Sequence, residues 1–246
     1  MPRTSLTVAA PAGDCPATLH TPEGEGPWPG VVMFVDAGGV RETFLVMADR
    51  LAAAGYSVLL PDVYYRTPFA PFAMDTVFTE PDERARLMAL MAGLTMDMVR
   101  EDSPAYADAL LDRPETSGSA IGTTGYCMGG KVSLTAAAAL GERAGAAASF
   151  HGGRLAVADD PSSPHHRVSD IRARVLVVAA TDDAGFGPEQ FALLEESLTA
   201  AGVPHTLETY PAAHGFAVPD NPTYDAAAEQ RHWTALEDFY GAALAR

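Results

Sequence analysis

Lysine and cysteine are scarce in this chain of 246 residues, which has a single lysine, Lys131, and two cysteines, Cys15 and Cys127. Its 32 acidic residues outnumber 16 basic ones, which leaves a formal charge of −16. Such a surface repels phosphate backbones and anionic lipid, so nucleic acid and membrane surfaces are not expected as partners. Two cysteines do not make a disulfide framework, and reduced thiols are normal in the cytoplasm.

Several signatures of targeting and of cofactor binding are also absent. The N-terminal segment lacks the hydrophobic region of a signal peptide, and no apolar run approaches the roughly 20 residues needed to cross a bilayer. There is no CxxC, HExxH, GxGxxG after a strand or Walker phosphate loop. We therefore expect a cytoplasmic protein, a monomer or homodimer, that acts on a small molecule without a metal or cofactor.

What remains is an alternation of strand-like and helix-like segments. Apolar runs such as VVMFVD at 31–36 are typical of strands buried on both faces, and segments with helical periodicity follow them. Residues 82–99 and 103–112 are predicted as two separate helices, and residues 63–81 as a long aromatic loop over a pocket. We expect one domain over residues 1–246, with a mostly parallel central sheet and helices on both of its faces.

The segment GYCMGG places Cys127 between a predicted strand, 119–126, and a predicted helix, 131–140. It matches the nucleophile-elbow pattern GxSxG with sulfur in place of oxygen. A helix N-terminus favours the thiolate, which is the reactive form of cysteine. The alternative is a small apolar residue in a tight glycine-rich turn.

A base and an orienting acid should follow the nucleophile in chain order. Asp182 and Asp183 come directly after a predicted strand, and His214 follows the next one. His214 can serve as the base while an aspartate fixes its tautomer. Of the two acids we choose Asp182, because it lies nearer the strand end; Asp183 is the alternative.

These residues resemble the dienelactone hydrolases, the cysteine branch of the α/β-hydrolase fold. The resemblance rests on GYCMGG, on the Asp182 and HGF positions, and on GYSVLLPDVYYR at 55–66, and it covers nearly the whole chain. It implies that Cys127 attacks an ester or lactone carbonyl, that His214 moves the proton and that Asp182 orients His214. It also implies an oxyanion hole made of the backbone N–H groups of Met128 and Ala37.

Two positions depart from the family pattern. A family glutamate that governs the ionisation of the cysteine is replaced by Asp36, which is one methylene shorter and is our candidate for tuning the nucleophile. Of two family arginines that hold a substrate carboxylate, Arg86 is a plausible match to the first, although a solvated helix face is also open to it. Val218 stands at the second position. Because only one of the two arginines that hold a substrate carboxylate has a match here, we expect a neutral or more apolar acyl substrate.

Aromatic and histidine side chains near the predicted strand ends are candidates for the pocket wall. His151 either lines the pocket or is a hydrogen-bonded structural histidine. The other candidates are Tyr64, Tyr65, Phe186 and Phe216. The predicted function is hydrolysis of small esters or lactones through a thioester. The alternatives are a binding protein or sensor with the same fold, motivated by Asp36, and a redox role for Cys127.

Overall fold

The structure is a computed structural model that describes residues 1–244; residues 245 and 246 of the predicted domain lie outside the described residues. Eight strands form one sheet in the order β1-β2-β4-β3-β5-β6-β7-β8. The strands are β1 (Arg3–Ala10), β2 (Gly13–His20), β3 (Trp28–Phe34), β4 (Ser57–Pro61), β5 (Thr116–Tyr126), β6 (Ala144–Phe150), β7 (Arg174–Asp182) and β8 (His205–Ala213). The β1–β2 and β2–β4 pairs are antiparallel and every other pair is parallel, so the prediction of a mostly parallel sheet is confirmed.

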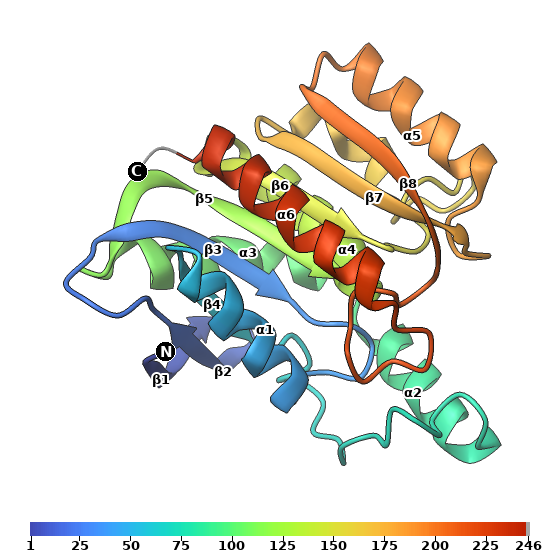
Figure 1. Ribbon diagram of the computed structural model, residues 1–246, viewed down its shortest axis with the longest axis horizontal. Helices are drawn as coiled ribbons and strands as arrows, with labels where there is room; N and C mark the ends of the chain where they lie inside the picture. The colour runs from blue at the N-terminus through green and yellow to red at the C-terminus, as the bar shows by residue number, and fades with distance from the viewer. Residues whose placement is uncertain (245–246) are drawn as a thin grey trace.

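Helices cover both faces of this sheet (Figure 1). They are α1 (Glu42–Ala53), α2 (Pro81–Gly93), α3 (Met96–Leu111), α4 (Met128–Leu140), α5 (Pro188–Ala200) and α6 (Ala226–Ala243), with 3-10 segments η1 (Gly141–Arg143) and η2 (Pro164–Asp170). In Figure 1, α1 and α6 lie in front of the sheet and α3 and α4 lie behind it. The segment η2 packs against both α4 and α5. The predicted α/β architecture, with helices on both faces, is therefore confirmed.

The boundary between the two helices after the aromatic loop differs from the prediction. The chain leaves the helical conformation at Leu94, and α3 then runs without a break from Met96 to Leu111. The side chain of Thr95 accepts a hydrogen bond from the Met98 N–H and caps the new helix. The gap between the two predicted helices, residues 100–102, lies inside α3. The cap at Thr95, which a single Thr signals weakly in the sequence, sets the boundary instead.

The central strands supply the core and fix where the candidate residues emerge. Strands β3 and β4 are buried along almost their whole length, as continuous apolar runs on both faces require. Asp36, Cys127, Asp183 and His214 each follow the carboxyl end of a parallel strand, β3, β5, β7 and β8 respectively. Ligands bind at this edge of open parallel sheets. No helix within residues 1–244 has the length and apolar character that a membrane crossing needs.

Candidate active site

Cys127 lies at the turn between β5 and α4. Its backbone has a conformation that is rare for residues other than glycine. Its backbone has φ 55° and ψ −117°, and α4 begins at the next residue. The Cys127 N–H lies 3.1 Å from the carbonyl oxygen of Phe150 and 3.2 Å from Nδ1 of His151. A non-glycine residue at positive φ is strained, and such strain persists only where the surrounding structure holds it. The half-buried thiol is therefore presented at a fixed place at the sheet edge.

The glycines on either side of Cys127 are required by close backbone packing. A Cβ atom at Gly125 would lie 1.9 Å from the carbonyl oxygen of Gly129, and one at Gly129 would lie 2.4 Å from that of Val35. At Gly130 it would lie 2.4 Å from Oγ of Ser149. The turn thus brings α4 directly against β3 and β6, which is the strand-turn-helix packing expected of a nucleophile elbow.

His214 joins Cys127 to an aspartate. Its Nε2 atom lies 3.0 Å from Sγ of Cys127, and its Nδ1 atom lies 2.7 Å from Oδ2 of Asp183. The second carboxylate oxygen of Asp183 accepts the Gly185 N–H at 2.7 Å, and the side chain is buried. With both oxygens held, the carboxylate fixes the imidazole so that Nδ1 carries a proton and Nε2 faces the sulfur.

The choice of Asp182 as the orienting acid is corrected by this geometry. Asp182 is the last residue of β7 and pairs in register with Ala213; its carbonyl oxygen accepts the His214 N–H at 3.0 Å. Because side chains alternate along a strand, its own carboxylate is exposed to solvent while that of Asp183 turns inward. The acid one step beyond the strand end is therefore the partner of His214.

The charge environment of His214 favours the imidazolium form. Burial works to lower the pKa of His214, but hydrogen bonds with Asp183 and Cys127, reinforced by the charges of both groups, raise it to about 10. An imidazolium beside the sulfur favours the thiolate, as does the N-terminus of α4. The imidazolium form of His214 thus places a positive charge next to the sulfur, which is an arrangement that activates a cysteine nucleophile.

The two backbone N–H groups that were predicted to form an oxyanion hole follow the carboxyl ends of β3 and β5. Within residues 1–244, neither the Ala37 N–H nor the Met128 N–H donates to a protein acceptor. The Tyr64 hydroxyl contacts both residues, at 3.3 Å from the Ala37 carbonyl oxygen and 2.9 Å from Sδ of Met128. Tyr64 thus contacts both of these residues, and burial raises the pKa of its hydroxyl far above the ordinary value.

Asp36 does not contact the cysteine in the way that the family pattern led us to expect. Its two carboxylate oxygens accept from Arg41 at 2.7 and 2.9 Å, and Oδ1 also accepts the Gly38 N–H. Among the described residues, no side-chain hydrogen bond of Asp36 reaches Cys127. Arg41 in turn donates two bonds of 2.7 Å to Asp220, on the segment that follows His214. Arg41 thus ties the loop of Ala37 to the loop of His214.

This bridge was missed in the sequence, where nothing pairs Arg41 with Asp220 across 179 positions. We expect Arg41→Met to lower the free energy of unfolding by about 3 kcal/mol, because it leaves the buried Asp36 carboxylate without its cation. Urea titration measures the change. The matched control is Arg3→Met, which removes an exposed pair with Glu42 and Asp49 and should cost less than about 1 kcal/mol. Equal losses in the two variants would contradict the structural role of the bridge.

His151 packs against both His214 and Phe216. The ring of His151 is fully buried, 5.3 Å from the ring of His214 and 4.9 Å from that of Phe216. Because Nδ1 of His151 faces the Cys127 N–H, the ring accepts there and is neutral; burial lowers its pKa well below the ordinary value. His151 therefore supports the elbow as a hydrogen-bonded residue, one of the two roles predicted for it.

The remaining pocket candidates lie apart from the sulfur or are engaged elsewhere. The Tyr65 hydroxyl donates to Asp102 on α3, away from the catalytic pair. Arg86 donates to the carbonyl oxygens of Ala70 and Pro71, pairs with Glu83 and lies 3.9 Å over the ring of Phe72. Phe186 borders a small cavity together with Asp183, and Cys127 does not line that cavity. The guanidinium of Arg86 thus binds the aromatic loop and Glu83, and it is not free to bind a substrate anion.

Known proteins resemble this chain in sequence and in structure. The family model for the dienelactone hydrolase family matches residues 15–244. A relative from Methylorubrum extorquens with the provisional name carboxymethylenebutenolidase is 28% identical, over 93% of this chain and 77% of its own length. A dienelactone hydrolase-like promiscuous phosphotriesterase from metagenomic libraries superposes with TM-score 0.78 at 26% identity, over 99% of both chains. A provisionally named dienelactone hydrolase from Klebsiella pneumoniae superposes with TM-score 0.83 at 21% identity, over 98% of both chains.

Proposed function

The chain belongs to the dienelactone hydrolase family, and from this premise and the geometry at Cys127 we propose that it hydrolyses small neutral esters or lactones through a thioester. The observation that carries the proposal is the chain of contacts from Sγ of Cys127 to Nε2 of His214 and from Nδ1 of His214 to Asp183. A nucleophile, a base and an orienting acid in this arrangement define acyl transfer by covalent catalysis.

The proposed reaction begins with the thiolate of Cys127 attacking the acyl carbon, so that a C–S bond forms and the carbonyl oxygen becomes an oxyanion. The free N–H groups of Met128 and Ala37 would receive that oxyanion; such donors are worth about 3 to 4 kcal/mol each. As the C–O bond breaks, the His214 imidazolium gives its Nε2 proton to the leaving oxygen. Neutral His214 then takes a proton from water, which attacks the thioester and releases the acid and the thiolate.

The substrate class follows from the charges around the site. Arg86 is held by the loop carbonyls and Glu83, and Val218, at the second clamp position, is buried and apolar. Tyr64, whose ring packs edge-on against Phe69, brings aromatic surface to the side of Met128. No free cation of the predicted clamp is thus available in the described part of the chain for a substrate carboxylate, and we propose a neutral, apolar acyl group.

The experiment that tests this proposal compares two p-nitrophenyl esters of equal acyl length, the butyrate and the monosuccinate. We expect turnover of the butyrate. The kcat/KM for the monosuccinate should be lower by a factor of about ten or more, because the site offers no partner for its carboxylate. A phosphotriester belongs in the same panel because one structural relative is named for that activity. Absence of turnover for every ester and lactone would favour the alternative of a binding protein.

The pH dependence follows from the raised pKa of His214. Because the hydrogen bonds with Asp183 and Cys127 raise that pKa to about 10, His214 keeps the proton that it gives to the leaving oxygen throughout the neutral range. We therefore expect kcat/KM to fall only as the pH rises through about 10, once the spontaneous hydrolysis rate is subtracted. A profile that instead rises around pH 6.5, the ordinary pKa of histidine, would show a neutral His214 acting first as a base.

A further inference from the structure

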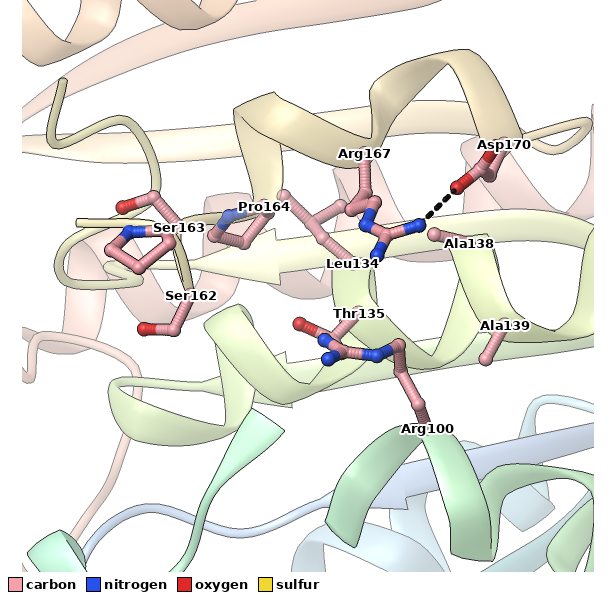
Figure 2. A pocket seen from close by; sticks show the side chains of 11 residues that line it. Arg100, Leu134, Thr135, Ala138, Ala139, Ser162, Ser163, Pro164, Arg167 and Asp170 are labelled. Atoms are coloured by element: carbon pink, nitrogen blue, oxygen red, sulfur yellow. Dashed lines mark ion pairs between the residues drawn. The ribbon is translucent and has the colours of Figure 1, made fainter. Parts of the chain in front are cut away.

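A cavity of about 310 Å³ lies on the face of the sheet that α3 and α4 cover (Figure 2). Its walls come from α3, α4 and η2 and from the segment that leads into η2. In Figure 2, Arg167 enters from η2 above, Arg100 enters from α3 below, and residues of α4 lie between them. None of Cys127, Asp183 and His214 lines this cavity.

The floor of the cavity is largely apolar. Leu134, Ala138 and Ala139 of α4 form it together with Thr135, and Pro161 and Pro164 border it. Small-molecule sites are mostly apolar with a few polar groups that fix orientation, and they span about 300 to 1,000 Å³. This cavity is at the small end of that range, so a ligand must be compact.

Two arginines are the polar groups available to a ligand. Arg100 pairs with Asp97 and Arg167 with Asp170, each within its own helical segment. The partner carboxylates are exposed, and a guanidinium has five N–H donors, so these pairs leave donors free. Surface ion pairs of this kind are worth little, and a ligand can therefore replace them at small cost.

The hydroxyl groups around the cavity are committed within the protein. Thr135 donates to the carbonyl oxygen of Lys131, Ser163 donates to that of Arg154, and Ser162 donates to the carboxylate of Asp160. A ligand must therefore be anchored by Arg100 and Arg167, whose planar forks match a carboxylate. The carboxylate of Asp170 also lines the cavity and disfavours a second negative charge on the ligand.

We propose that this cavity binds a monoanionic carboxylate with a compact apolar body, such as an arylacetate. The carboxylate is held by Arg100 and Arg167, and the apolar body rests on Leu134 and Ala138 of α4. In a chain with a formal charge of −16, two arginines from different elements line one cavity, which none of Cys127, Asp183 and His214 lines.

The proposal is tested by calorimetric titration of phenylacetate into protein whose Cys127 has been blocked with iodoacetamide, so that the catalytic site is obstructed. We expect saturable binding of one equivalent. The controls are 2-phenylethanol, which keeps the apolar body without the charge, and inorganic phosphate, which keeps charge without the body. Both should bind at least about tenfold more weakly than phenylacetate. Equal binding of 2-phenylethanol, or no saturable binding of phenylacetate, would overturn the proposal.

Variants separate this cavity from other sites on the protein. Arg100→Gln and Arg167→Gln should each weaken phenylacetate binding about tenfold, and Ala138→Phe should block it by filling the floor. Arg84→Gln, an exposed arginine of α2, makes the same charge change outside the cavity and should leave binding unchanged. Circular dichroism verifies that each variant is folded. Binding that survives both Ala138→Phe and the two arginine changes would place the ligand elsewhere and reject the assignment.

Discussion

Replacing Cys127 with alanine is expected to lower kcat for p-nitrophenyl butyrate by about 10⁴-fold or more, because the thioester can no longer form. The sulfur lies 3.0 Å from Nε2 of His214, at the turn where α4 begins. Steady-state kinetics on purified variant and parent measure the change. The fold should persist, since the substitution removes one half-buried atom.

The second cysteine provides the matched control. Cys15 is fully buried in β2, within 3.9 Å of the Tyr106 hydroxyl, and burial raises the pKa of its thiol to about 12. A neutral, buried thiol does not react, so Cys15→Ala should retain the parent kcat within about threefold. Loss of activity in Cys15→Ala with full activity in Cys127→Ala would remove the elbow from the mechanism.

Replacing Asp183 with asparagine is expected to lower kcat by about 10³- to 10⁴-fold, since the amide would favour the wrong tautomer of His214. Oδ2 of Asp183 lies 2.7 Å from Nδ1 of His214 and holds the proton there, which leaves Nε2 to face the sulfur. The same change removes a charge that raises the pKa of His214, so the alkaline limb of the pH profile should move toward lower pH.

Asp182→Asn is the control for the adjacent carboxylate. Asp182 is exposed and meets His214 only through its backbone carbonyl, which the substitution keeps. We expect kcat within about threefold of the parent, as is usual for a surface substitution. If Asp182→Asn were the damaging change and Asp183→Asn the mild one, the orienting acid would have been assigned to the wrong residue.

The pair Asp182 and Asp183 also shows where sequence reasoning reaches its limit. Local sequence patterns predict three features of the molecule. Apolar runs predict the buried strands, glycines around Cys127 predict the elbow, and polar residues at strand ends predict the order of nucleophile, acid and base. Which of two adjacent acids turns inward depends on the register of β7 against β8, which joins Asp182 to Ala213. Register is a tertiary property, and proximity to the strand end favoured the wrong residue.

The ion pairs of Arg41 could not be predicted from the sequence either. Asp36 was singled out because it follows a strand. Its positively charged partner is Arg41, five positions further along the chain, which also pairs with Asp220 beyond His214. An ion pair between distant segments leaves no periodic signal in a single sequence. The same holds for Arg86, which the resemblance assigned to substrate and the structure engages with Glu83 and the loop carbonyls.

The central claim, covalent catalysis by Cys127, is tested most directly by trapping the acyl-enzyme. The protein is mixed with p-nitrophenyl acetate, quenched in acid within the first turnover, and examined by intact and peptide mass spectrometry. We expect one added acetyl group, located on the peptide that contains Cys127 and absent from Cys127→Ala. Steady release of p-nitrophenol with no acetyl group on Cys127 at any quench time would contradict it.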